Sequence, residues 1–162
     1  MRYSVIVISL IALTLCSCNN GNRCYDSVDT LMVTSFSIDG FKTINSLVIN
    51  GVNRSDLGDT LVNDSSSALT KRYNLPLSLT ADSTGFVIKT NGTTDTLFIR
   101  HTMSLVFVSR YCGFAPDYVL LGTRHTSGID SVKIFHPKVN PLSIQLATND
   151  QNISIYFSSA RH

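Results

Sequence analysis

The sequence predicts an all-β protein, an antiparallel β-sandwich of immunoglobulin-like or similar form with about nine short strands, and a small β-barrel as the alternative. All eleven acidic residues are Asp, which favours helix caps and turns, whereas Glu favours helix interiors. Ser, Thr, Asn and Val are abundant, as in strands joined by tight turns. No segment places apolar residues at the helical period of 3.6. These observations exclude a helical protein and favour two packed antiparallel sheets.

Residues 1–17 have the layout of a lipoprotein signal peptide. Arg2 supplies a positive start, and an apolar run follows from Val5 to Leu15. This run is shorter than the roughly 20 apolar residues that span a membrane, and it matches the three-part pattern of a secretory signal. We therefore expect export of the chain and no transmembrane helix.

The end of the apolar run resembles the bacterial lipobox. Leu15, Ser17 and Cys18 fit its register, whereas Cys16 would place Leu15 next to the cleavage site. We expect cleavage before Cys18 and a diacylglycerol on its sulfur, with a plain signal peptide as the alternative. Residues 18–24 would then be a polar tether, and residues 25–162 a single β-sandwich domain bound to the membrane through the lipid on Cys18.

The first half of the domain contains strand patterns separated by turn signals. Alternation begins at residues 29–34, and a second apolar segment covers residues 44–50. Residues 56–67 are rich in loop formers, and whether a short strand lies among them stays open. Residues 73–79 read as an edge strand, because Pro76 cannot donate a ladder hydrogen bond.

The second half of the domain has clearer strands. Residues 85–90 and 94–101 flank Asn91-Gly92, a strong hairpin turn because both residues tolerate positive φ. Residues 104–110 are apolar on both faces, which predicts a central strand. Further strands are expected at residues 118–123, 132–134 and 153–157.

Two cysteines remain in the mature domain once Cys18 is lipidated. They are Cys24 and Cys112, and an even pair in an oxidising compartment predicts a disulfide. On the chain-entropy model such a bond would contribute about 4–5 kcal/mol. Two buried free thiols are the alternative.

A short pattern of Asp followed by Ser or Thr recurs along the chain. In one interpretation Asp ends a turn and the following residues start a strand. The pattern also resembles the O-glycosylation motif of Bacteroidetes envelope proteins, in which the hydroxyl after Asp carries the sugar. The candidate residues are Ser27, Thr30, Thr60, Ser83, Thr96 and Ser131.

The sequence contains no recognisable catalytic or metal-binding motif. His101, His125 and His136 lack compact metal-ligand spacing, and no Glu is present to act as a general base. His101 is expected at a core edge and His136 in a turn. We therefore expect no cofactor, no metal and no enzyme. The net charge of +2 without a basic cluster makes nucleic acid an unexpected partner.

The lipobox and several short segments together resemble an uncharacterised family of Bacteroidetes envelope lipoproteins. The segments are Cys24-Tyr25-Asp26, residues 29–33, residues 73–77 and Tyr111-Cys112-Gly113. The resemblance implies a cell-envelope location. Lipoproteins of that phylum that are exported to the cell surface resemble one another in having acidic residues after the lipid-bearing cysteine. Residues 19–22 contain none, so we expect a location in the outer membrane, facing the periplasm.

Two hypotheses for the function follow. The first is a non-catalytic binding or structural lipoprotein that contacts another envelope protein or a glycan. The second is a periplasmic hydrolase of envelope polymers with a cryptic Asp/His or Ser/His site. Such a site would need His101 or His125 to meet Asp117 or another Asp in a cleft.

Overall fold

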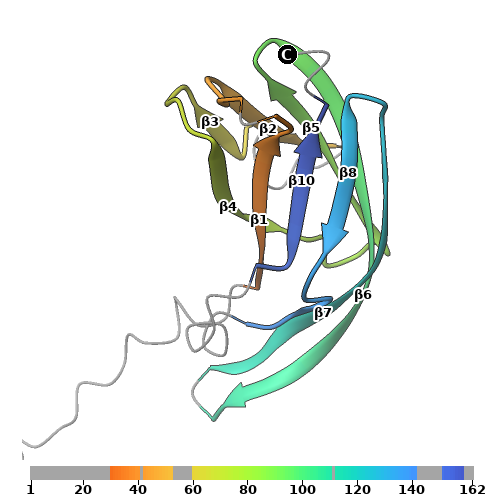
Figure 1. Ribbon diagram of the computed structural model, residues 1–162. Helices are drawn as coiled ribbons and strands as arrows, with labels where there is room; N and C mark the ends of the chain where they lie inside the picture. The colour runs from red at the N-terminus through yellow and green to blue at the C-terminus, as the bar shows by residue number, and fades with distance from the viewer. Residues whose placement is uncertain (1–29, 41, 53–59, 111, 142–150, 159–162) are drawn as a thin grey trace, which may run out of the picture.

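Two β-sheets face each other in the computed structural model of the chain (Figure 1). The structure describes residues 30–40, 42–52, 60–110, 112–141 and 151–158. Within these ranges the chain forms ten strands and no helix, so the predicted all-β class is confirmed. The six-stranded sheet curls around the four-stranded one, which gives a sandwich-like form.

The four-stranded sheet joins both ends of the described chain. Its order is β4 (Thr70–Pro76), β1 (Leu31–Ile38), β10 (Ile153–Phe157) and β8 (Ile129–Ile134). β1 and β10 pair in parallel, which differs from the expected purely antiparallel arrangement. Parallel neighbours require a long connection, and here most of the domain lies between the two strands. β4 is an edge strand, as its proline predicts.

The six-stranded sheet contains the longest strands. Its order is β3 (Val62–Asp64), β2 (Leu47–Gly51), β5 (Ser83–Thr90), β6 (Thr93–Ser109), β7 (Gly113–His125) and β9 (Lys138–Val139). All its pairs are antiparallel. The segment near residue 61 that the sequence left open does form the short strand β3. Asn91 and Gly92 connect β5 to β6 with φ of 47° and 88°, which confirms the predicted hairpin turn.

The core lies between the inner faces of the two sheets. Alternate residues of the strands point inward, as the period of two requires. Phe36 and Phe157 stack at 6.5 Å between ring centroids, and both are fully buried. The largest side chains without solvent contact are Tyr118, Phe36, Phe86, Phe157, Met32, Ile44, Leu47, Ile49, Leu75, Ile88, Leu97 and Ile99.

An ion pair between a buried lysine and a half-buried aspartate joins the two sheets. Lys71 on β4 lies 3.1 Å from a carboxylate oxygen of Asp64 on β3, and the Lys71 side chain is only 2% exposed. The hydroxyl of Tyr73, also on β4, donates a hydrogen bond to the same carboxylate. The Asp64 carboxylate thus satisfies a buried ammonium group and a phenol from the opposite sheet.

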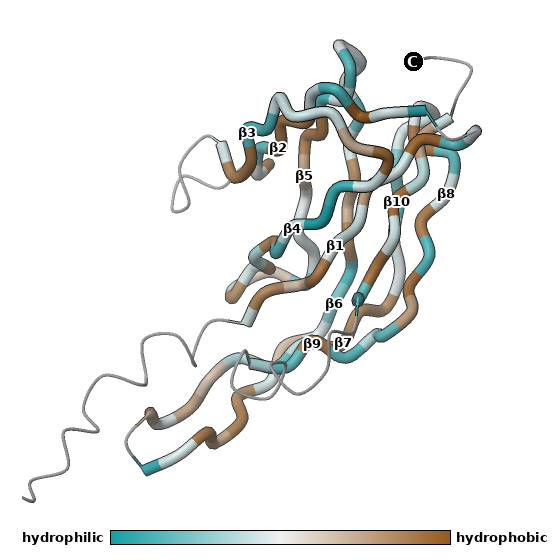
Figure 2. Tube along the Cα trace, turned by 60° about the vertical axis from the view of Figure 1, so that its left-hand side comes forward, coloured by the Kyte–Doolittle hydropathy of each residue, from teal (hydrophilic) through white to brown (hydrophobic). Residues whose placement is uncertain are grey.

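The second half of β6 leaves the sandwich and corrects one prediction. Residues 102–109 end β6 and residues 113–117 begin β7, and together with the turn between them they project as a two-stranded ribbon that we call the arm (Figure 2). The sequence predicted a central strand at residues 104–110. That prediction is wrong, because Leu105 is 63% exposed and Phe107 is 59% exposed. β6 is instead one continuous strand of 17 residues.

Candidate functional site

The predicted covalent sites of the N-terminal region lie outside the described residues. They are Cys18, Cys24 and Ser27. Cys112 lies at the tip of the arm, where its backbone N–H donates to the Ser109 hydroxyl at 3.0 Å. Because Cys24 is not described, its pairing with Cys112 stays a prediction.

The other glycosylation candidates differ in accessibility. The Thr30 side chain is buried and its hydroxyl donates a hydrogen bond to the Pro116 carbonyl. Thr60 is exposed. The remaining three are half-buried within strands: Ser83, Thr96 and Ser131. Of the described candidates, Thr60 therefore offers the most accessible hydroxyl for modification.

His101 is a fully buried core residue. Its Nε2 lies 2.8 Å from the Thr84 hydroxyl, and its ring meets the Tyr118 ring edge to face at 5.3 Å. Burial lowers the pKa of His101, because the charged imidazolium loses hydration. The neutral imidazole thus packs as part of the interior, deeper than the core edge that the sequence predicted.

The predicted meeting of His101 with Asp117 does not occur. His101 pairs with Leu120 and Asp117 pairs with Ser104, so the two side chains project from opposite faces of the β6–β7 ribbon. Asp117 instead lies 3.8 Å from the ammonium of Lys138.

His125 lies at the end of β7, beside the turn that leads to β8. Its Nδ1 lies 3.1 Å from the Thr126 carbonyl oxygen. The nearby Asp95 carboxylate accepts hydrogen bonds from the Thr126 hydroxyl at 2.6 Å and from the Gly128 N–H at 3.0 Å. Asp95 therefore holds the β7–β8 turn. His136 lies between β8 and β9, in the connection where the sequence predicted a turn.

An open cleft of about 610 Å³ lies on the outer face of the six-stranded sheet. It crosses β5, β6 and β7 and is lined by Asp82, Ser83, Phe98, Arg100, Leu121, Gly122, Thr123 and Arg124. The ladder passes from Arg100–Gly122 to His101–Leu120, so Leu121 is an extra residue on β7. Such bulges redirect side chains and occur often beside functional sites.

Three strands build one wall of the cleft as a stack. Phe98 lies over Gly85, where an added Cβ would come within 2.8 Å of the phenyl ring. The guanidinium of Arg124 lies 5.7 Å from the centre of the same ring, within cation–π range. Gly85, Phe98 and Arg124 are direct partners across the ladder. The ring therefore holds Arg124 at the cleft while leaving its hydrogen-bond donors available.

The floor of the cleft is open because Gly122 has no side chain. A Cβ added there would meet no atom within 4 Å. Gly122 stands directly opposite Arg100, so the vacant position lies next to that residue on the neighbouring strand. A ligand group of modest size would thus reach the backbone between the strands.

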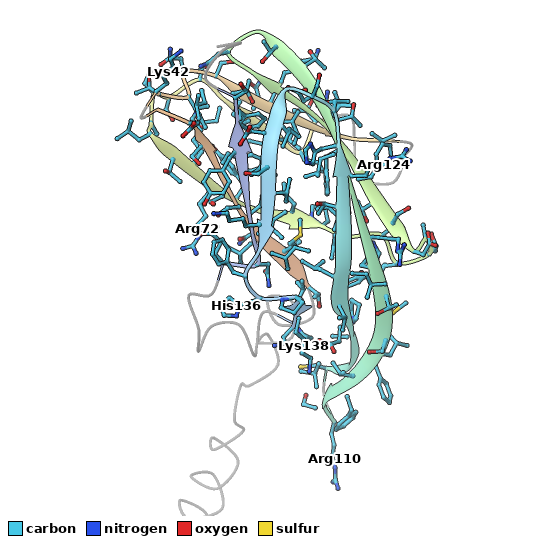
Figure 3. All side chains as sticks on the ribbon, turned by 45° about the vertical axis from the view of Figure 1, so that its right-hand side comes forward. Lys42, Arg72, Arg110, Arg124, His136 and Lys138 are labelled. Atoms are coloured by element: carbon cyan, nitrogen blue, oxygen red, sulfur yellow. The ribbon has the colours of Figure 1, made fainter. Side chains whose placement is uncertain are left out.

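The charge in the cleft is positive. Arg100 and Arg124 are both exposed, and neither makes an ion pair with another described residue. Asp82 is the single acidic residue among the lining. Figure 3 shows Arg124 beside the six-stranded sheet, well away from Arg110 at the tip of the arm. Two arginines beside an aromatic ring suit a carboxylate or phosphate on a partly apolar ligand.

The sequence contained part of the signal for this cleft. Strand alternation at residues 94–101 already placed Phe98 and Arg100 opposite the core residues Leu97 and Ile99. Alternation gives no indication that Arg124 joins them, because this depends on the register of β6 against β7. The bulge at Leu121 is likewise a property of the pairing.

Two features are absent from the described residues. No group of three or more His, Cys, Asp or Glu side chains stands where it would hold a metal ion. No helix in the described part of the chain is long and apolar enough to cross a membrane.

A family model matches the greater part of the chain. No curated protein and no solved structure matches the chain. The profile of a family of unknown function, DUF6452, matches residues 46–157, a range that contains the whole cleft and the arm. Because this match covers more than half of the sequence, the chain belongs to the DUF6452 family.

Proposed function

We propose that the chain is an envelope-anchored lipoprotein whose β domain binds ligands without catalysing a reaction, and that the cleft on β5, β6 and β7 is its binding site. The observation that carries the binding role is the pair of exposed guanidinium groups, Arg100 and Arg124, beside Phe98 in an open cleft. The volume lies in the range of small-molecule sites, roughly 300–1,000 Å³. The ligand class is a glycan or peptide segment that carries a carboxylate or phosphate.

The anchor is the lipid on Cys18, supported by the lipobox-like Leu15-Cys16-Ser17-Cys18. The resemblance to Bacteroidetes lipoproteins supports an outer-membrane location facing the periplasm. Mass spectrometry of the native protein tests the anchor. The mature chain should begin at Cys18 and carry diacylglycerol, and Cys18→Ser should leave an unprocessed, unlipidated chain. A mature chain that begins elsewhere would refute the anchor.

The same mass spectra test the covalent proposals on the folded domain. With Cys24 and Cys112 paired, alkylation without reductant should leave both sulfurs unmodified, and reduction should expose both. Glycosylation at the Asp-Ser/Thr pattern should add hexose-scale mass that maps first to peptides with Thr60, the exposed candidate. A native mass equal to polypeptide plus lipid would rule the sugar out.

Binding is tested with a charged probe and its neutral counterpart. Calorimetry with an oligogalacturonate should detect binding, whereas a malto-oligosaccharide of equal length should bind at least about tenfold more weakly, because charge-assisted hydrogen bonds contribute about 1.5–3 kcal/mol. Arg100→Gln and Arg124→Gln should each lower the affinity by about tenfold. Inorganic phosphate serves as the minimal anion.

A matched variant outside the cleft provides the control. Lys133→Gln removes an exposed cation that lies 5.4 Å from the Tyr156 ring on the other sheet, and it should leave binding unchanged. Equal losses from Lys133→Gln and Arg124→Gln would show that net charge, rather than the cleft, attracts the probe. Such a result would overturn the proposed site.

A further inference from the structure

The arm carries an apolar face made by both of its strands. Leu105 and Phe107 lie on β6, and Phe107 pairs directly with Phe114 on β7. The two phenyl rings meet edge to face at 5.5 Å, and Phe114 is 63% exposed. Met103, 39% exposed, extends the same face towards the sandwich. Soluble proteins seldom leave such a contiguous set of large apolar side chains in water.

The exposed charge of the arm is positive. Residues 102–116 contain no acidic residue, and Arg110 is their single charged residue. Asp117, at the base of the arm, is buried and lies 3.8 Å from the ammonium of Lys138. Arg110 is exposed at the far tip (Figure 3). A long cationic side chain beyond aromatic rings is the arrangement with which proteins contact phospholipid head groups, since the ring enters the apolar layer and the guanidinium stays with the phosphates.

The arm lies at the end of the sandwich where the described chain begins. Thr30, the first described residue, hydrogen-bonds the carbonyl of Pro116 at the base of the arm. The stretch from Cys18 to Thr30 spans at most about 40 Å when fully extended. The arm from Pro116 to its tip extends about 15 Å. A lipid on Cys18 would therefore hold the arm within reach of the bilayer surface.

We infer that the apolar face of the arm enters the interfacial layer of a phospholipid bilayer and is a second membrane contact of this protein. The inference rests on the proposed lipid anchor for its geometry, whereas the apolar face and the charge are properties of the described residues. The anchor supplies a high local concentration, so a weak insertion suffices. The contact would orient the sandwich and hold the Arg100–Arg124 cleft at a fixed height above the membrane.

A single tryptophan tests the insertion. The chain contains no Trp, so Phe114→Trp places a unique fluorophore on the arm. The full-length lipidated protein is reconstituted into vesicles of phosphatidylethanolamine and phosphatidylglycerol, with and without brominated acyl chains. We expect a blue-shifted emission, quenching by the brominated lipid, and at least about threefold protection from aqueous iodide relative to the control below. Phe107→Trp should behave alike, because the two positions are cross-strand partners.

The control is Leu69→Trp, at a similarly exposed apolar residue (54%). Leu69 precedes β4, which runs antiparallel to β1, so it lies at the end of the sandwich away from the arm. Its emission should remain red-shifted, accessible to iodide and unaffected by brominated lipid. Equal responses at residues 69 and 114 would overturn the inference.

The remaining outcomes are equally decisive. An arm tryptophan shielded from iodide but not quenched by brominated lipid, in a sample that crosslinks as a dimer, would show that a second copy covers the arm and would refute membrane insertion. Mass spectrometry of the same sample reports the lipid on Cys18 separately. Lipid present without quenching refutes the inference and keeps the anchor, whereas quenching without lipid refutes the anchor and keeps the inference.

Discussion

The two halves of β6 have the same kind of sequence and opposite environments. In the first half Leu97 and Ile99 alternate with outward-facing residues and are completely buried. In the second half Leu105 and Phe107 alternate in the same way and are mostly exposed. The four-stranded sheet covers the first half and ends before the second (Figure 1). Alternation thus predicts a strand, whereas burial depends on whether another element lies opposite.

The same substitution in each half gives the largest contrast. Leu97→Ala removes a buried side chain and leaves a cavity, so it should lower the free energy of unfolding by about 2–5 kcal/mol. Leu105→Ala should change it by less than about 0.5 kcal/mol, because its side chain already contacts water. Urea unfolding followed by circular dichroism measures both. Similar losses would mean that the arm is packed in solution and that the comparison is false.

Much of the fold was accessible from the sequence because its signals are local. The Asn91-Gly92 turn needs only two residues with positive φ, and Pro76 alone marked β4 as an edge strand. The parallel pairing of β1 with β10 was not accessible, since it joins residues from opposite ends of the domain. The exposure of the arm was not accessible either, because a strand that is apolar on both faces can be a buried central strand or part of an exposed ribbon.

The candidate site was accessible only in part. Alternation along the strand predicts that Phe98 and Arg100 lie on the outer face of the sheet. Arg124 joins them only through the register of β7 against β6. The prediction for Asp117 failed because its cross-strand partner is Ser104, three residues from His101, and an odd separation along a strand places side chains on opposite faces. Histidine is a residue type typical of catalytic sites, but His101 is fully buried in the core.

Two glycines in the covered half of the sheet offer a second contrast. Gly85→Ala would bring a methyl group within 2.8 Å of the Phe98 ring and 3.0 Å of the Val52 Cβ. The ring must then move, and the expected cost is about 1–3 kcal/mol. Displacing Phe98 should also release Arg124 and weaken binding of the oligogalacturonate. Unfolding and calorimetry on one preparation measure both effects.

Gly122→Ala is the matched control for Gly85→Ala. The added methyl meets no atom within 4 Å, and Gly122 is absent from the described residues with positive φ. We expect unchanged or slightly higher stability, because alanine restricts the unfolded chain. Gly122→Leu should keep the fold and fill the floor of the cleft, so it should reduce binding. Strong destabilisation by Gly122→Ala would contradict the open floor.

The smallest expected effect is a pH dependence of the folding stability, which arises at the ion pair between the two sheets. The arm is a single ribbon with no opposing sheet, so it has no such link. The Tyr73 hydroxyl, together with hydrogen bonds from Ser66 and Lys71, holds the pKa of Asp64 well below its usual range. A carboxylate with a lowered pKa stabilises the fold above its unfolded value of about 3.9, and this contribution is lost as the pH falls below that value. Asp64→Asn should therefore flatten the acid limb of the stability curve, measured by urea unfolding between about pH 5 and pH 2.

The alkaline limb separates Tyr73 from Asp64. Burial, with the hydrogen bond to Asp64, raises the pKa of Tyr73 to about 12, so the neutral phenol is favoured in the folded state. Its contribution is complete below the ordinary tyrosine value of about 10 and is lost as the pH rises from there towards 12. Tyr73→Phe should remove this alkaline dependence while the Lys71–Asp64 pair retains part of the acid limb. If Tyr73→Phe leaves both limbs unchanged, the phenol does not take part in joining the sheets, and the ion pair stands alone.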